Sequence, residues 1–525
     1  MIQKLLPALI VILLPISICY SQPNYDTRWL IGYCPGCKPG AINNSPYGGM
    51  YLNFESGTRE LSMVDMYSDN AVAVGNDAQG NLAFYTTGCK IFSHDFNLME
   101  NGDSINPGEF CGDGFYSLID LRSGNLILPL PEQANNYLYF HLNLMDITVG
   151  NAVINSLSLT EVDMTANNGL GKVVRKNQLL IEDSLSGYIS SVRHSNGRDW
   201  WIVLPRGNNR QFWTILVTPN GVAPPVLQTM PPPYTPFTKT YRIFLDWYPY
   251  FEDIPGDEYQ AETNNGQADF SPDGKTYCRA IPNGGDMEIY DFDRCTGILR
   301  LKRVFAMPPS PEGYQENVAG LAFSPDSKLL YFNNTFALYQ FDLEEQGMAN
   351  RNYTLIENYD FYQDQFFYSN FFQMRTAPDG KIYMFAGNGN HFVHIIESPN
   401  EKGLACNFRQ RGLELPKWTS FAVNYFPNFR LGEDLEHPCD ADNPAAFQVF
   451  PNPVSGNTLK MYIPYGNKAQ VRVYNAAGQL IQELTNLSPG LTNYTNTSDW
   501  PSGVYFFSAI IDSGKAVTRK VVVMR

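Results

Sequence analysis

Three tight-turn sequences recur in the middle of the chain at a constant spacing of fifty-three residues. They are Ser271-Pro272-Asp273-Gly274, Ser324-Pro325-Asp326-Ser327 and Ala377-Pro378-Asp379-Gly380. Proline presets φ at the start of such a turn, and the glycine in two of them accepts a positive φ. Each turn follows an apolar segment and precedes a strand-like run, so the pattern predicts repeated strand–turn–strand units. We therefore interpret the three aspartates as turn formers and not as calcium ligands.

A repeat of about 40 to 50 residues with this content is typical of β-propeller blades. Earlier turns at 77–81, 135–136 and 195–198 echo the pattern, which gives six recognisable hairpins in all. We expect an all-β, propeller-like domain of six to eight blades over residues 22–440. An array of β-sandwiches with ordinary turns is the alternative.

These segments resemble the blades of WD-like and periplasmic Tol-type propellers, although they lack the Trp-Asp signature of true WD repeats. The order of the middle region also resembles propeller-like extracellular regions of gliding and surface proteins from Bacteroidetes. The stretches that carry the second resemblance are 80–88, 99–102 and 293–297. Both resemblances imply a propeller fold, and the second implies an extracellular location.

The end of the chain has the pattern of a small separate domain. Val471 and Val473 alternate with polar residues, as in a half-buried strand, and Gly478 ends that strand. Two further runs, 504–511 and 517–524, are rich in β-branched and aromatic residues. Several short strands in so few residues predict a small β-sandwich over 446–525, preceded by a linker at 441–445.

This domain resembles the type A C-terminal sorting domain of the Bacteroidetes type IX secretion system. An F-P-N-P opening, a V-Y-N-x-x-G-Q core, a G-V-Y-F strand and a basic final strand stand in the expected order. The resemblance implies export, with the type IX machinery and its sortase-like protease as partners. The residues that it marks as the sorting signal are Pro451, Asn452, Pro453, Gly478, Gly503, Val504, Tyr505 and Lys520. An adhesive immunoglobulin-like module is the alternative.

The beginning of the chain has the pattern of a secretory signal peptide over residues 1–21. Lys4 precedes an apolar stretch that ends near small residues, and this stretch is shorter than the roughly 20 residues of a membrane span. We expect cleavage after Ser21, with Gln22 as the new terminus. Cys19 raises a lipoprotein alternative, but Ile18 stands where lipoprotein signals need a small residue. No later segment resembles a transmembrane span, so we expect a secreted protein or one on the outer-membrane surface.

Charge and cysteine content agree with an exported protein. The formal net charge of −15 disfavours nucleic acid and anionic lipid as partners. Eight cysteines remain after Cys19 is removed, and an even number in an exported chain favours disulfides. For the C-x-x-C pair at 34–37 we expect a local disulfide or two free thiols. Cys278 and Cys295 are a doubtful pair, because position 278 should face about 290 across the hairpin.

The sequence contains no recognisable catalytic or metal-binding motif, and we expect no cofactor and no metal. His391 and His394 lie three apart on an expected strand, which places them on opposite faces. The carboxylates between 252 and 258 are interpreted as a charged loop. Two of them across a groove could instead hydrolyse a glycoside, but sequence alone does not place them.

Aromatic clusters are the remaining candidates for function. Trp247, Tyr248, Tyr250 and Phe251 form one cluster and the run 359–372 forms another, and rings rimmed by amides suit sugars or peptides. Packing between blades explains such clusters equally simply. We expect a propeller that binds or scaffolds a glycan or a protein at the cell surface, without catalysis. A polysaccharide hydrolase or lyase on a propeller scaffold is the alternative.

Overall fold

The protein was analysed as a computed structural model that is almost entirely β-strand. The structure describes residues 23–33, 48–55, 59–64, 73–108, 111, 123–148, 151–207, 210–230, 266–281, 286–306, 320–344, 353–364, 367–387, 389–419, 424–434, 439, 447–450, 452–463, 469–487, 492–511 and 516–525. Within these ranges the helical residues are Cys111 and two 3-10 turns, Asn167–Gly169 and Gly403–Cys406. The predicted all-β class is therefore confirmed.

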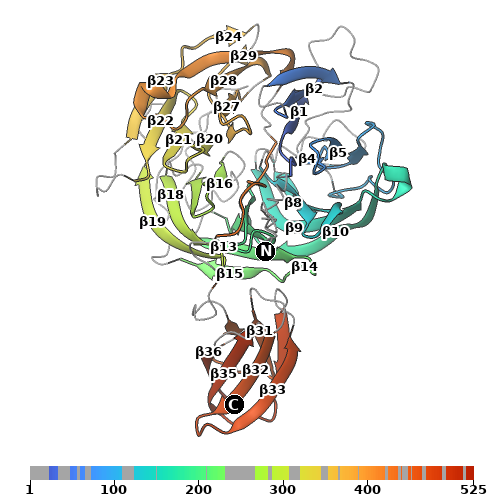
Figure 1. The fold of residues 1–525 in the computed structure, drawn as a ribbon, viewed down its shortest axis with the longest axis vertical. Coiled ribbons are helices and arrows are strands. Elements are labelled where there is room, and N and C mark those ends of the chain that lie inside the picture. The colour runs from blue at the N-terminus through green and yellow to red at the C-terminus, as the bar shows by residue number, and fades with distance from the viewer. Residues whose placement is uncertain are drawn as a thin grey trace, which may run out of the picture.

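In the part of the chain that the structure describes, seven antiparallel sheets stand around a common centre, and each is one blade of a propeller (Figure 1). The first three blades are β1 (Arg28–Tyr33), β2 (Gly48–Asn53) and β3 (Glu60–Val64); β4 (Ala73–Asn76), β5 (Leu82–Thr86) and β6 (Ile91–Ser93); and β7 (Asn125–Leu130), β8 (Gln133–Thr148), β9 (Asn151–Asp163) and β10 (Lys172–Glu182). The fourth blade consists of β11 (Ser190–Arg193), β12 (Trp200–Pro205), β13 (Gln211–Thr218), β14 (Gly221–Val222) and β15 (Val226–Thr229).

The last three blades contain the repeated turns. They are β16 (Ala268–Phe270), β17 (Thr276–Ile281), β18 (Asp286–Asp293) and β19 (Ile298–Ala306); β20 (Gly320–Phe323), β21 (Leu329–Asn333), β22 (Ala337–Asp342) and β23 (Tyr353–Asn358); and β26 (Met374–Thr376), β27 (Ile382–Phe385), β28 (Asn390–Ile396) and β29 (Phe408–Thr419). A two-stranded hairpin, β24 (Gln363–Asp364) and β25 (Phe367–Tyr368), lies between the sixth and seventh blades in the chain. Seven blades lie within the predicted range of six to eight.

The repeated turns join the first two strands of these blades, as the sequence predicts. Gly274 and Gly380 adopt φ values of 72° and 78°, in the left-handed region that glycine tolerates. The Asp273 carboxylate accepts a hydrogen bond from the Lys275 amide at 3.0 Å, and Asp379 accepts one from Lys381 at 3.1 Å. Each aspartate therefore closes its own turn.

The two ends of the ring meet through aromatic packing between the first and seventh blades. The ring of Trp29 on β1 lies 6.0 Å from that of Tyr383 on β27, measured between centroids, and Phe54 lies 5.5 Å from Tyr383. Strands β1 and β29 are neighbours at this junction. No hydrogen-bonded sheet joins the two blades in the described residues, so side-chain packing closes the ring at this point.

The C-terminal strands form two further sheets outside the ring (Figure 1). One contains β30 (Gln448–Phe450), β31 (Thr458–Tyr462) and β34 (Thr492–Asn496), and the other contains β33 (Leu480–Leu487), β32 (Ala469–Asn475), β35 (Gly503–Ile511) and β36 (Val517–Val523). Val471, Phe507 and Val521 are fully buried in their shared core. Residues 441–445, the predicted linker, lie outside the described residues, and the domain limits at 22, 440 and 446 stay predictions.

Two disulfides connect described cysteines, Cys89 with Cys111 and Cys295 with Cys439. Cys278 and Cys406 are free and buried. Cys278 pairs in register with Ile289, one residue from the predicted position, so Cys295 lies beyond its reach across the hairpin. Cys34 and Cys37 lie outside the described residues.

We expect the secreted protein to keep Cys278 and Cys406 as protected thiols, because both side chains are buried. Alkylation of the native, unreduced protein followed by mass spectrometry should leave both unmodified, and alkylation after unfolding in denaturant should label both. The peptides that contain Cys89 and Cys439 should stay disulfide-linked throughout. Labelling of either member of a proposed disulfide without reduction would contradict the pairing.

Candidate functional site: the centre of the ring and the C-terminal domain

A segment that follows the last blade crosses the centre of the ring. Residues 424–434, here called the crossing segment, run from the side of β1 and β4 toward the fourth blade (Figure 1). Tyr425 and Phe429 are 5% and 4% exposed, and both join the hydrophobic cluster of the second, third and fourth blades. The protein's own side chains therefore lie at the centre of the ring, where the blades of a propeller surround a channel.

Tyr425 contacts the fourth and seventh blades and is linked to the fifth blade through Arg375. The Ser191 amide on β11 donates a hydrogen bond to the Tyr425 hydroxyl at 2.8 Å, and the Arg375 guanidinium on β26 lies 4.5 Å from the centroid of the tyrosine ring. Arg375 also forms an ion pair at 2.8 Å with Asp269 on β16. Burial raises the pKa of the Asp269 carboxyl, and the nearby Arg375 opposes this shift.

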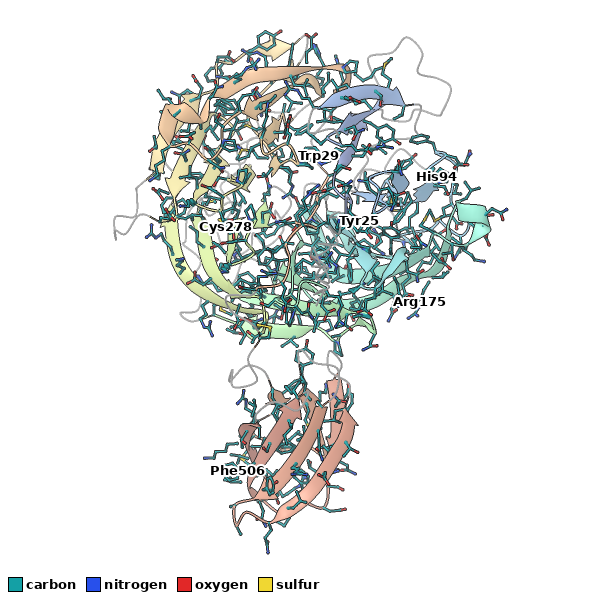
Figure 2. All side chains as sticks on the ribbon, viewed as in Figure 1. Tyr25, Trp29, His94, Arg175, Cys278 and Phe506 are labelled. Atoms are coloured by element: carbon teal, nitrogen blue, oxygen red, sulfur yellow. A yellow bond between two sulfur atoms is a disulfide. The ribbon has the colours of Figure 1, made fainter. Side chains whose placement is uncertain are left out.

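Phe429 and Arg430 form the next contacts of the crossing segment. The Phe429 ring lies 5.1 Å from that of Tyr25 and 5.3 Å from that of Trp200, measured between centroids. Figure 2 shows Tyr25 near the centre of the ring. Arg430 pairs with the buried Asp26, whose pKa is raised by burial although Arg430 favours the charged form. Residues that precede the first blade thus meet residues that follow the last one.

The far end of the crossing segment is fixed to the fourth and fifth blades. The Arg294 guanidinium donates to the Gly432 carbonyl at 2.6 Å, and the Asp434 amide donates to the Ser195 carbonyl at 2.9 Å. A short distance further along the chain, Cys439 is bonded to Cys295 beside Arg294. Hydrogen bonds and one covalent bond therefore hold this end in place.

The buried carboxylates of the ring are all engaged by arginine. Among the described residues of the ring, Asp26, Asp199 and Glu288 are the carboxylates that are less than a tenth exposed. Asp199 pairs with Arg198 at 2.7 Å, and Glu288 pairs with Arg210 and Arg279, each also at 2.7 Å. Burial is outweighed at Glu288 by Arg279, Tyr290 and Arg210, so the pKa of that carboxyl is lowered, whereas burial raises the pKa of the Asp26 carboxyl although it pairs with Arg430. In the described part of the chain, no three His, Cys, Asp or Glu side chains gather as a metal site would require.

The predicted sorting-signal residues fall on structural positions of the C-terminal domain. The Asn452 amide donates to the Lys520 carbonyl at 2.8 Å and accepts from the Val522 amide at 2.9 Å, which ties the start of the domain to its last strand. Pro453 follows Asn452, and Pro451 lies outside the described residues.

The remaining predicted signal residues lie at a turn and on β35. Gly478 adopts a φ of 77° in the turn between β32 and β33. Gly503, Val504 and Tyr505 begin β35, where the Tyr505 ring stacks on Trp500 at 4.8 Å. These contacts give Asn452, Gly478 and Tyr505 structural roles in the domain, and the role of the predicted signal residues in recognition stays a prediction.

The predicted ligand contacts Trp247, Tyr248, Tyr250 and Phe251 lie outside the described residues, between β15 and β16 in the chain. His391 and His394 are placed apart: His394 is buried and its Nε2 lies 2.7 Å from the Ser369 carbonyl oxygen, whereas His391 Nε2 lies 3.8 Å from Glu414. Sequence reasoning did not identify the crossing segment. Its signal was the aromatic sequence Asn-Tyr-Phe-Pro-Asn-Phe-Arg at 424–430, which directly follows the last blade.

Comparison with known families assigns the end of the chain. Residues 448–524 match the family described as the secretion system C-terminal sorting domain. The C-terminal domain is a secretion-system sorting domain. The chain is therefore a cargo of the type IX secretion system, delivered to the cell surface or the extracellular space. Among the described residues, no helix has the length and apolar character needed to span a membrane.

The ring was compared with solved structures and with curated proteins. A putative 6-phosphogluconolactonase from Bacteroides uniformis is 13% identical with a TM-score of 0.34, covering 90% of this chain and 99% of its own. A periplasmic gluconolactonase from Pseudomonas aeruginosa is 11% identical with a TM-score of 0.37, covering 95% and 99%. A β-propeller domain from Myceliophteria thermophila is 10% identical with a TM-score of 0.33, covering 65% and 87%. No curated protein matches the chain significantly.

Three buried histidines make the ring sensitive to acid. Burial lowers the pKa of His141 to about 3 and the pKa values of His194 and His394 to about 4. Below pH 6.5 the unfolded chain gains a proton at each site and the folded protein does not, until about pH 4. The free energy of unfolding should therefore fall as pH falls, by about 1.4 kcal/mol per pH unit for each histidine. The raised pKa values of Asp26 and Asp269 have the opposite effect on stability. In the pH range just above the ordinary carboxyl pKa, the folded protein holds more protons at these sites than the unfolded chain does, so the free energy of unfolding rises as pH falls.

Urea unfolding between pH 7 and 4.5 measures this slope. H394Q keeps a donor for the Ser369 carbonyl. It should lower the slope of the free energy of unfolding against pH by about 1.4 kcal/mol per pH unit, which is the contribution of one proton. The control is H94Q, because His94 is exposed at the outer edge of the ring (Figure 2). Equal slopes for H394Q and the unaltered protein would show that His394 is not the source of the acid sensitivity.

Proposed function

We propose that the ring binds or scaffolds a glycan or protein partner at the cell surface, where the sorting domain delivers it. The occupied centre of the ring is the observation that supports this proposal. The crossing segment lies at the centre of the ring, and the three buried carboxylates of the described ring are paired with arginine. The ligand then binds at the loops and the rim of the ring. Contacts through aromatic and amide groups at these places require no residue that titrates near neutral pH.

The connection between β15 and β16 is the part of the sequence best suited to a ligand. It contains Trp247, Tyr248, Tyr250 and Phe251, which we propose as ligand contacts. A propeller presents the connections of several blades on one rigid face, so aromatic residues between two blades would add to a broad binding surface.

The proposed function also requires two proteolytic cleavages during export. The signal peptide is removed after Ser21, and residues 446–525 are removed by a sortase-like protease of a Bacteroidetes host after they have engaged the type IX machinery. The Cys295–Cys439 disulfide precedes that second cut, so the crossing segment stays bound to the ring. The intact mass of the secreted protein checks both cleavages, since it should correspond to a chain that begins at Gln22 and lacks the sorting domain.

A combined binding and turnover assay tests the proposed function. The secreted protein is offered xylan, mannan and a soluble β-glucan, and both retention and the release of reducing ends are measured. We expect retention of at least one polymer without turnover, and an affinity that varies little between about pH 6 and 8. Depolymerisation with a bell-shaped pH profile, abolished by one Asp or Glu substitution, would support the hydrolase or lyase instead.

A further inference from the structure

The hairpin β24–β25 lies at the rim of the ring, near β23 and β29 (Figure 1). The two residues before β24 and the last residue of β25 have exposed aromatic side chains. Phe361, Tyr362 and Tyr368 are 50%, 39% and 49% exposed. Every other Phe, Tyr and Trp of the ring that the structure describes is buried or only partly exposed. An aromatic-rich protein that buries nearly all its described rings but leaves three within eight residues in solvent points to a contact surface.

The backbone beneath these rings is held in place on several sides. The Tyr359 hydroxyl donates to the Tyr362 carbonyl, and the Ser369 amide donates to the same carbonyl at 3.1 Å. The Arg411 guanidinium lies 4.4 Å from the centroid of the Tyr362 ring and also pairs with Asp360. The rings are therefore presented on a pre-organised support, which lowers the entropic cost of binding.

Phe361 has a backbone conformation that a bulky residue rarely adopts. Its φ is 57°, in the left-handed region that side chains of this size rarely occupy. The Phe361 ring lies 6.0 Å from that of Phe336 and 5.5 Å from that of Tyr359 between centroids, and half of the residue stays in solvent. Packing within the fold therefore uses only part of this aromatic residue and leaves the rest open to a ligand.

The size and the borders of the patch favour a sugar over a protein as its occupant. Phe and Tyr side chains bury about 150–250 Å² each when fully enclosed, so three half-exposed rings offer roughly 200–350 Å². A stable protein interface takes about 800 Å² from each partner. The border carries the Asp360–Arg411 pair and the exposed Gln363, which lies opposite Tyr368 in the hairpin. Planar hydrogen-bonding groups beside an aromatic face match a sugar ring, whose C–H face is apolar and whose hydroxyls lie at its edge.

We propose that Phe361, Tyr362 and Tyr368 form a carbohydrate-binding platform, with Asp360, Arg411 and Gln363 as hydrogen-bonding partners of the sugar hydroxyls. This site rests on the proposed binding function and gives it a location and a ligand class. It is separate in sequence from the aromatic cluster at 247–251, so each can be tested without the other.

Affinity electrophoresis in gels that contain xylan, mannan or soluble β-glucan tests the platform. The variants are F361A and Y368A, both at exposed positions, with L355A as the matched control, since Leu355 is a 46% exposed aliphatic residue on β23. Each aromatic substitution should weaken retention by the bound polymer roughly 2- to 12-fold. L355A should bind like the unaltered protein, and thermal unfolding should confirm that all three variants are folded.

The outcomes separate this site from the general proposal. Retention that F361A and Y368A leave unchanged overturns the platform while the binding function of the ring stands. Absence of retention for all three polymers contradicts both. Binding to an outer-membrane protein that depends on the hairpin, without binding to any glycan, would show that the platform is a protein-docking site and overturn the assigned ligand class.

Discussion

The contacts of the crossing segment with the inside of the ring are the interaction on which the rest of the structure depends. A ring of seven sheets has two ends, and here they meet by side-chain packing of Trp29 and Phe54 against Tyr383. The crossing segment adds contacts that span the ring, from Arg375 through Tyr425 to Ser191. Packing and polar contacts to several blades make each blade depend on the others, which favours cooperative folding.

The disulfide at the end of the crossing segment reinforces this closure. Cys295 and Cys439 are 144 residues apart in sequence, and in the chain-entropy picture a loop of that size destabilises the unfolded state by roughly 5 kcal/mol. The bond also lies before the sorting domain, so removal of that domain would leave the ring closed. The Cys295–Cys439 disulfide therefore stabilises the ring outside the cell, and it does so whether or not the sorting domain is still attached.

Filling the centre also determines where function can reside. The buried carboxylates of the described ring are paired, with Glu288 between two arginines and Asp26 against Arg430. We therefore propose that ligands bind at the loops and the rim. Phe361, Tyr362 and Tyr368, at and beside the hairpin β24–β25, are the exposed rings on which the proposed specificity rests.

Features that depend on local chemistry could be predicted from the sequence, and features that depend on distant contacts could not. The Pro-Asp turns form as expected because Asp273 and Asp379 bond to amides two residues away. The sorting domain was recognisable because its motifs lie close together in the chain. The crossing segment depends on partners as distant as Asp26 and Ser191, and the pairing of Cys439 with Cys295 follows from its path. The exposure of Phe361 depends likewise on how two blades and a hairpin meet.

Amide hydrogen exchange of the secreted, oxidised protein tests the central claim most directly. If the crossing segment closes the ring, peptides covering 424–434 should exchange as slowly as those covering the inner strands β11 and β26. Reduction of the Cys295–Cys439 disulfide should then accelerate exchange in the same peptides before the outer strands respond. Fast exchange across 424–434 in the oxidised protein, at the rate of an exposed loop, would contradict the account.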